Sequence, residues 1–311
     1  MITTVTLNPA VDKTIEIDNF QIGTVNRVSA VRLDAGGKGI NVSKVIKSLG
    51  SSSRAVGILS GKSGSFIKEY LDSENIENHF IITKGETRTN TKIVDKINHT
   101  NTDINECGPL VSEEDLHKVN KEFCKGLNED SVVVFSGSIP KNVSRNIYMD
   151  WIKEAKKNGA KTILDADGEL FKQGIKAGPY LIKPNIHELE EFFSQNISTK
   201  EEAVRLSREL FKYGIKIIVI SLGAQGALFI KKDAAVSVSG IKVQVQSTVG
   251  AGDSMVAALA VAIDKNYDFE KSIKLSVACG TANVTTSGTQ AADLETVLSF
   301  EKQVKYEYIN L

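Results

Sequence analysis

Residues 161–193 read KTILDADGELFKQGIKAGPYLIKPNIHELEEFF and carry the clearest structural signal in the chain. Lys161–Leu164 and Tyr180–Ile182 are short and almost continuously apolar, which is typical of strands covered on both faces in a parallel sheet. Ile186–Ser194 follows with the spacing of an amphipathic helix. The alternation continues on both sides, with strands expected at Ser131–Phe135 and Ile215–Ile220 and helices at Ser144–Asn158 and Lys200–Tyr213. Strands that alternate with helices need crossover connections, so we predict a layered α/β core around a mainly parallel sheet.

The first part of the chain follows a different pattern, in which apolar and polar residues alternate with a period of two. This alternation occurs at Thr14–Asp18, Asn26–Leu33, Asn90–Ile97 and Thr102–Asn105. It predicts strands with one face toward the protein and one toward solvent. We expect a small antiparallel sheet built by two excursions from the core, residues 12–35 and 88–108, that serves either as a lid or as a dimer surface.

Charge and composition exclude several classes of protein. The 311 residues contain 38 Lys and Arg and 38 Asp and Glu, so the chain lacks the surplus of cations needed to bind nucleic acid or an acidic membrane. The longest apolar run, Met255–Ile263, is far shorter than the about 20 residues of a membrane-spanning helix. The three cysteines are scattered and suggest no disulfide framework. The N-terminus resembles a strand and not a signal peptide, so we expect a cytoplasmic protein. The chain also lacks the HExxH and GxSxG patterns of zinc proteases and serine hydrolases.

The most informative local pattern is Gly250-Ala251-Gly252-Asp253-Ser254, placed directly before the apolar helical run. Glycines let the backbone approach a ligand closely, and the free amides and dipole of a helix start attract an anion. Asp253 would repel a phosphate, so in such a loop it would accept a proton or orient a metal ion. The alternative is an acid that only complements the helix dipole.

A second glycine cluster, Gly36-Gly37-Lys38-Gly39-Ile40-Asn41, opens the next helical segment. It fits neither the dinucleotide-binding fingerprint nor the phosphate loop of nucleoside triphosphatases. Its backbone amides, the Lys38 cation and the Asn41 amide suit polyhydroxyl or phosphate groups. The alternative is a flexible turn with a solvated lysine.

Two further clusters follow predicted strands. In Lys183-Pro184-Asn185-Ile186-His187-Glu188, Asn185 and Glu188 have the spacing of a helix capping box, and their oxygens also suit a hydrated divalent cation. Ser221-Leu222-Gly223-Ala224-Gln225-Gly226-Ala227 can hold a nucleotide or simply begin a hairpin.

Together these clusters resemble the ribokinase-like, PfkB-type carbohydrate kinases, in the branch of 1-phosphofructokinase and tagatose-6-phosphate kinase. The resemblance rests on seven segments in order: Thr6–Asp12, Gly36–Asn41, Glu86–Asn90, Ser136–Pro140, Lys183–Asn185, Ser221–Gly226 and Ser247–Ser254. It implies one three-layer αβα domain over residues 1–311, with the small β sheet as a lid that also joins two copies into a homodimer. It also implies ATP as co-substrate, Mg²⁺, and a sugar phosphate as acceptor.

The resemblance further implies roles for individual residues. Asp253 would be the general base, and the amides of Gly250, Ala251 and Gly252 would hold the transferring phosphoryl group. For the sugar phosphate the implied contacts are Asp12, Gly37, Asn41, Lys38, Arg88 and Ser138, with Arg27 reaching across a dimer. For the nucleotide they are Lys183, Ser221, Gly223 and Gly226, and Asn185 and Glu188 would position magnesium through water. We expect conversion of fructose 1-phosphate to fructose 1,6-bisphosphate. Tagatose 6-phosphate and fructose 6-phosphate are the alternative acceptors. A remote alternative function is that of a non-catalytic sugar-phosphate sensor.

Overall fold

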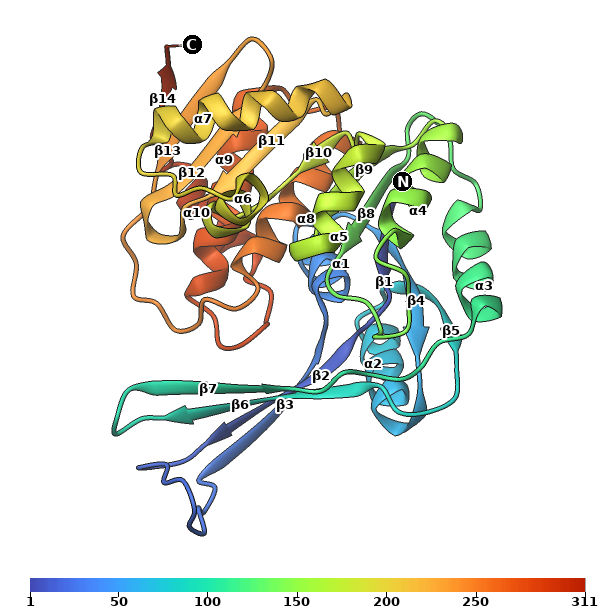
Figure 1. Cartoon of the computed structure of the whole chain (residues 1–311). Coiled ribbons are helices and arrows are strands. Elements are labelled where there is room, and N and C mark those ends of the chain that lie inside the picture. The colour runs from blue at the N-terminus through green and yellow to red at the C-terminus, as the bar shows by residue number, and fades with distance from the viewer. Residues whose placement is uncertain (311) are drawn as a thin grey trace.

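A ten-stranded sheet forms the centre of the protein, of which a computed structural model describes residues 1–310 (Figure 1). In spatial order its strands are β14 (Tyr306–Ile309), β13 (Ala235–Ser239), β12 (Gly226–Ile230), β11 (Ile217–Ser221), β10 (Leu181–Ile182), β9 (Lys161–Asp165), β8 (Val132–Ser136), β1 (Ile2–Thr6), β4 (Ser53–Leu59) and β5 (Glu77–Ile82). Neighbouring strands are parallel from β11 to β5, while β12, β13 and β14 are antiparallel additions at one edge. The predicted mainly parallel sheet is therefore confirmed.

Helices cover both faces of this sheet and complete three layers. One face carries α3 (Glu113–Cys124), α4 (Ile147–Lys157), α5 (Gly168–Gly174), α6 (Ile186–Phe193) and α7 (Lys200–Arg208). The other carries α1 (Lys38–Ser48), α8 (Ala251–Asp264), α9 (Phe269–Val284) and α10 (Leu294–Glu301). Each face has its own cluster of buried apolar side chains. Among residues 1–310, no helix has the length and apolar character of a membrane span.

The helices begin and end close to the predicted positions, with two differences. The helix expected from Ser144 begins at Ile147, because the residues before it form a turn in which the Asn146 backbone N–H donates to Ser144 Oγ. The helix expected over Lys200–Tyr213 is α-helical only to Arg208. Its last residues, Glu209–Tyr213, form a tighter 3₁₀ helix. Gly214 follows it with φ of 90°, which only glycine adopts readily.

The second sheet, which we call the lid, consists of β3 (Ala30–Gly36), β2 (Ala10–Glu16), β6 (Arg88–Asp95) and β7 (Thr100–Asn105), in that order. Figure 1 shows it projecting away from the core as two long hairpins. Both hairpins are antiparallel, as predicted, but β2 and β6 join them as a parallel pair, since both strands run outward from the core. Large apolar side chains are exposed on the lid, namely Ile22, Val25, Val28, Val31, Leu33, Ile97 and Ile104.

The base of the lid is fixed to the core by α2 (Gly61–Ser73). A third apolar cluster joins Val11 of β2 and Ala35 of β3 to Ile67 and Leu71 of this helix. The four side chains are almost or fully buried. The start of β2 and the end of β3 are therefore packed against the core, while the far ends of these strands extend into solvent.

The strand order has a reversal that predicts where a ligand binds. β1 lies between β4 and β8, so the chain builds the sheet outward from β1 in both directions. In open α/β sheets, ligands bind beyond the carboxyl ends of the parallel strands, beside such a reversal. Both lid hairpins leave the core at this same edge of the sheet, and α1 begins there.

Candidate active site

A cleft of about 1230 Å³ lies along this edge and reaches from the lid to the β11–β12 hairpin. Most of the residues singled out from the sequence line it: Asp12, Gly37, Lys38, Asn41, Arg88, Lys183, Asn185, Glu188, Ser221, Gly223, Gly226, Gly250, Ala251, Gly252 and Asp253. Ser138 and Arg27 are not among the residues that line it. The structure thus brings together in one cavity side chains that are far apart in the sequence.

The start of α8 presents backbone amides to the cleft. Gly250 precedes the helix with φ of 84°, a conformation that other residues rarely adopt, and no side chain caps the helix start. An uncapped helix start leaves amide hydrogens without partners, and the helix dipole adds partial positive charge there. This end of α8 can therefore bind an anion such as a phosphoryl group.

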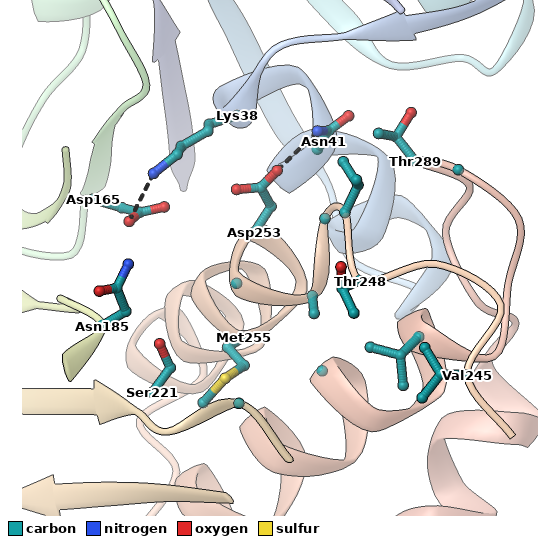
Figure 2. A pocket seen from close by; sticks show the side chains of 18 of the residues that line it. Lys38, Asn41, Asp165, Asn185, Ser221, Val245, Thr248, Asp253, Met255 and Thr289 are labelled. Atoms are coloured by element: carbon teal, nitrogen blue, oxygen red, sulfur yellow. Dashed lines mark hydrogen bonds and ion pairs between the residues drawn. The ribbon is translucent and has the colours of Figure 1, made fainter. Parts of the chain in front are cut away.

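Asp253 lies in the first turn of α8 and is only 6% exposed, although it lines the cleft. Its Oδ2 accepts a hydrogen bond of 2.8 Å from Nδ2 of Asn41 on α1, as Figure 2 shows. Burial and the neighbouring Asp165 raise the pKa of Asp253 to about 6, against the opposing influence of Lys38 and the Asn41 hydrogen bond. A carboxylate that is poised near neutral pH and faces a cavity can take a proton from a bound alcohol.

Asp165, at the carboxyl end of β9, was not singled out from the sequence. Its Oδ1 lies 3.3 Å from Nζ of Lys38, as Figure 2 shows. The same atom lies 3.4 Å from Nζ of Lys183, and the carboxylate is almost fully buried. Burial favours its neutral form, but the two ammonium groups outweigh burial and lower its pKa. Burial also opposes the charge of Lys38, yet the surrounding carboxylates, Asp165 first, raise the pKa of Lys38. The surrounding carboxylates therefore hold Lys38 as a cation in the middle of the cleft, and Lys183 Nζ lies beside the same Asp165 carboxylate.

The capping box predicted for Asn185 and Glu188 is present at the start of α6. Asn185 Oδ1 accepts from the Glu188 backbone N–H at 2.9 Å, and Glu188 Oε2 accepts from the Asn185 backbone N–H at 2.8 Å. Burial raises the pKa of Glu188. No group of three or more His, Cys, Asp or Glu side chains within residues 1–310 is placed to hold a metal ion. A cation bound here would need further ligands from phosphates or water.

The lid end of the cleft contains Asp12 of β2. Its Oδ1 accepts a hydrogen bond of 3.1 Å from Nδ2 of Asn90 on β6. A Cβ atom at Gly36 would lie only 2.0 Å from Asp12 Oδ2, so this glycine makes room for the carboxylate. Burial raises the pKa of Asp12. A carboxylate in this position can accept hydrogen bonds from the hydroxyl groups of a bound sugar.

Three cationic or polar residues near the lid differ in their placement. Arg88, the first residue of β6, lines the cleft and has no carboxylate within ion-pair distance in residues 1–310. Ser138 lies just beyond β8, and its Oγ is 3.3 Å from Nδ2 of Asn8. Arg27 is exposed in the connection between β2 and β3, so the structure of one chain does not bring it to the cleft.

The opposite end of the cleft is apolar. The turn Ser221–Gly226 begins the hairpin of β11 and β12, as one interpretation of its sequence predicted, and it also lines the cleft. Apolar residues line the cavity beyond it, including Val243, Val245, Met255, Val277 and Val284. This end suits a flat apolar group such as a nucleotide base, while the lid end suits hydroxyl groups and anions.

Comparisons with known proteins agree with this chemistry. A family model described as pfkB family carbohydrate kinase matches residues 5–297. The chain is 39% identical over 283 residues to a 1-phosphofructokinase of Borreliella burgdorferi, with 91% of each chain covered. It is 37% identical over 282 residues to a 1-phosphofructokinase of Bacillus subtilis, covering 91% of this chain and 92% of that one. Among solved structures, the phosphofructokinase-2 of Escherichia coli in complex with fructose-6-phosphate is similar with a TM-score of 0.91 and 26% identity, covering 97% of this chain and 98% of that chain. The chain belongs to the pfkB family of carbohydrate kinases.

Proposed function

We propose that the protein transfers the γ-phosphoryl group of ATP to fructose 1-phosphate and so forms fructose 1,6-bisphosphate. As a member of this family the chain is a sugar-phosphate kinase with ATP as its co-substrate. The relatives named 1-phosphofructokinase support fructose 1-phosphate as the acceptor. The single observation that carries the proposal is the buried Asp253 carboxylate, which lies in the cleft beside the free amides of α8.

Asp253 acts as the general base in this proposal. The acceptor hydroxyl loses its proton to the carboxylate as its oxygen attacks the γ-phosphorus, and the bond from that phosphorus to the β-phosphate oxygen breaks. Deprotonation makes the hydroxyl a stronger nucleophile. The hydrogen bond from Asn41 fixes the direction of the carboxylate.

Negative charge on the transferring group is stabilised by groups that are in place before the reaction. The amides of Gly250, Ala251 and Gly252 lie at the start of α8. Lys183 Nζ lies close to them, since a Cβ atom added at Gly252 would be only 3.1 Å from it. Lys38 adds a second cation, held by Asp165. Fixed dipoles and charges of this kind need no reorganisation during phosphoryl transfer, which is why they lower its barrier.

The two ends of the cleft would bind the two substrates. Asp12, Gly37 and Asn41 would contact the sugar hydroxyls, and Arg88 and Ser138, with Lys38, would bind the phosphate already on the sugar. The turn containing Ser221, Gly223 and Gly226, together with Lys183, would bind ATP. The phosphates of ATP would then lie toward Lys183 and the start of α8, which places its γ-phosphoryl group near Asp253.

The residues near α6 fit a magnesium ion held through water. Glu188 uses only Oε2 in the capping box, and Asp165 Oδ2 is buried with no partner within residues 1–310. Carboxylate oxygens and water are the ligands that Mg²⁺ prefers, usually together with substrate phosphates. Asn185 and Glu188 would hold the hydrated ion, which would supply charge neutralisation on the β- and γ-phosphates of ATP.

We also propose that the chain forms one catalytic domain in the cytoplasm and dimerises through the lid segments within residues 12–35 and 88–108. The proposal is supported by the apolar side chains exposed on the lid, of which Ile22 is 91% and Val25 is 86% exposed. Large apolar side chains that gather on one projecting element and remain exposed favour a protein–protein contact there. In a dimer, the exposed Arg27 of each chain would be able to reach the cleft of the other.

A comparison of acceptors tests the proposed function. Initial rates with ATP, Mg²⁺ and fructose 1-phosphate, fructose 6-phosphate or tagatose 6-phosphate give kcat/KM for each sugar. We expect fructose 1-phosphate to have the highest kcat/KM. If fructose 6-phosphate or tagatose 6-phosphate has a higher kcat/KM, that sugar phosphate is the substrate instead. Arg88→Met should raise KM for the sugar phosphate about 100-fold, because charge-assisted hydrogen bonds to phosphate are lost, while KM for ATP should stay within about twofold.

A further inference from the structure

Asn8, in the short connection between β1 and β2, is not part of the cleft but touches three segments that meet beside it. It is 5% exposed. Its backbone carbonyl accepts a hydrogen bond of 3.2 Å from Nε of Arg88. Its side-chain Nδ2 donates to Ser138 Oγ and to the backbone carbonyl of Cys107, both at 3.3 Å. One buried residue therefore connects the first residue of β6, the segment after β7 and the segment after β8.

We propose that Asn8 is a positioning residue, which holds Arg88 and Ser138 at the spacing that the phosphate group of the sugar requires. This inference rests on the proposed function, in which Arg88 and Ser138 bind that phosphate. Asn8 itself would not touch the substrate, because it is buried and both of its amide hydrogens are donated to groups of the protein.

The hydrogen bonds of Asn8 leave the phosphate-binding atoms free. A serine hydroxyl has one hydrogen to donate and can accept as well. Because Ser138 Oγ accepts from Asn8, its own hydrogen remains available for a phosphate oxygen. Arg88 is held in a similar way, since Nε donates to Asn8 and Nη1 donates to the carbonyl of Glu106 at 3.4 Å. Nη2 remains free to donate to a phosphate.

The side chain of Asn8 has little freedom to move. A Cβ atom at Gly108 would lie 2.2 Å from Asn8 Oδ1, so the amide packs directly against the backbone of this glycine. Both amide hydrogens are used, and the position is closed to solvent. A shorter side chain would therefore lose both donated hydrogen bonds and could not recover them by shifting.

The matched control is Asn142, which joins two of the same segments without touching Arg88 or Ser138. Its Nδ2 donates to the Val111 carbonyl at 2.7 Å, and its Oδ1 accepts from the Val111 N–H at 3.2 Å. Asn142→Ala removes hydrogen bonds of the same kind between the β7–α3 and β8–α4 connections. Its kinetic constants should stay within about twofold of the wild type.

Steady-state kinetics of Asn8→Ala tests the inference, with the sugar phosphate that the wild type uses best. We expect KM for the sugar phosphate to rise about tenfold, because the side-chain hydrogen bonds to Ser138 and to the Cys107 carbonyl are lost, while the bond from Arg88 to the Asn8 backbone carbonyl stays. KM for ATP and kcat should change by less than about threefold. In Asn8→Ala/Ser138→Ala, the rise in KM should be smaller than the product of the two single effects, because the residues act as one unit.

Three results would overturn the inference while the proposed function stands. The first is an unchanged KM for the sugar phosphate in Asn8→Ala. The second is a change of equal size in KM for the sugar phosphate, KM for ATP and kcat. The third is a rise in KM in the double variant that equals the product of the rises in the two single variants. A wild-type protein that phosphorylates no sugar phosphate overturns the proposed function and this inference with it. If Asn8→Ala does not fold, Asn8→Ser keeps a polar group but is too short to reach Ser138, and the same expectations apply to it.

Discussion

The hydrogen bond between Asn41 and Asp253 gives a prediction about the pH dependence of the reaction. Asp253 can accept a proton only when it is ionised, so activity should fall as the pH drops through its pKa of about 6. Asn41 donates to the ionised form and lowers this pKa. Asn41→Ala should therefore raise the pKa of Asp253 and move the acid limb of the pH profile to higher pH.

The size of this effect follows from the geometry. The bond is 2.8 Å long and buried, and a hydrogen bond to a charged group contributes about 1.5–3 kcal/mol. Since about 1.4 kcal/mol corresponds to one pKa unit, the acid limb should move upward by at least about one unit. Any loss of sugar binding in the variant is the same at all pH values. The ratio of wild-type to variant kcat/KM should therefore be at least about fivefold larger at pH 6, where about half of the wild-type Asp253 but only about a tenth of the variant's is ionised, than at pH 8.5.

The assay is direct measurement of ADP formation between pH 5.5 and pH 9, quenched and separated so that no coupling enzyme limits the rate. Ser138→Ala is the control, because Ser138 makes no hydrogen bond to Asp253. Its profile should be parallel to that of the wild type. A ratio for Asn41→Ala that stays constant across the pH range would refute the assignment of the acid limb to Asp253.

Three further predictions concern the base, the sugar end of the cleft and the lid. Asp253→Asn should reduce kcat about 10²- to 10⁴-fold. It should also stabilise the fold at pH 8, because the wild type loses stability as the pH rises through the raised pKa of about 6. Chemical denaturation should show that the variant unfolds with a free energy about 2–3 kcal/mol higher than the wild type at pH 8, and that this difference disappears at pH 4. Gly36→Ala should raise KM for the sugar phosphate by about tenfold or more without affecting KM for ATP, because its Cβ would displace the Asp12 carboxylate; equal changes in both constants would contradict this reason. Ile22→Glu/Val25→Glu should convert a dimer into monomers in sedimentation velocity, and a wild type that sediments as a monomer at all concentrations would disprove the lid dimer.

The sequence predicted those parts of the site that have a local signal. Gly250, Gly252 and Asp253 stand together directly before an apolar run, and in the structure all three lie at the start of α8 and line the cleft. The capping box of Asn185 and Glu188 is likewise a pattern of neighbouring residues, and the structure contains it. The parallel sheet followed from apolar runs that alternate with amphipathic helices.

Other features depend on residues that are far apart in the sequence, so no local pattern predicts them. Asp165 is a single acid after a strand, and its role appears only when Lys38 and Lys183 are brought to it. Its position at the carboxyl end of a buried strand was the one available signal. The parallel pairing of β2 with β6 depends on where the two lid excursions leave the core, which their alternating sequence does not contain.

In the proposed function, the two buried carboxylates of the cleft have different tasks, one holding cations and the other deprotonating an alcohol. Asp165 lies between Lys38 and Lys183, which lower its pKa, so it stays ionised and keeps both ammonium groups in place. Burial raises the pKa of Asp253 toward neutrality, where a general base works best, and the charge of Asp165 adds to this shift. If Asp165 were neutral, the lysines would lose their partner and Asp253 would become a weaker base. The charge that positions the lysines proposed to bind phosphate is therefore also the charge that adjusts the proposed base, which gives a physical reason for placing an acid in a cleft proposed to bind anions.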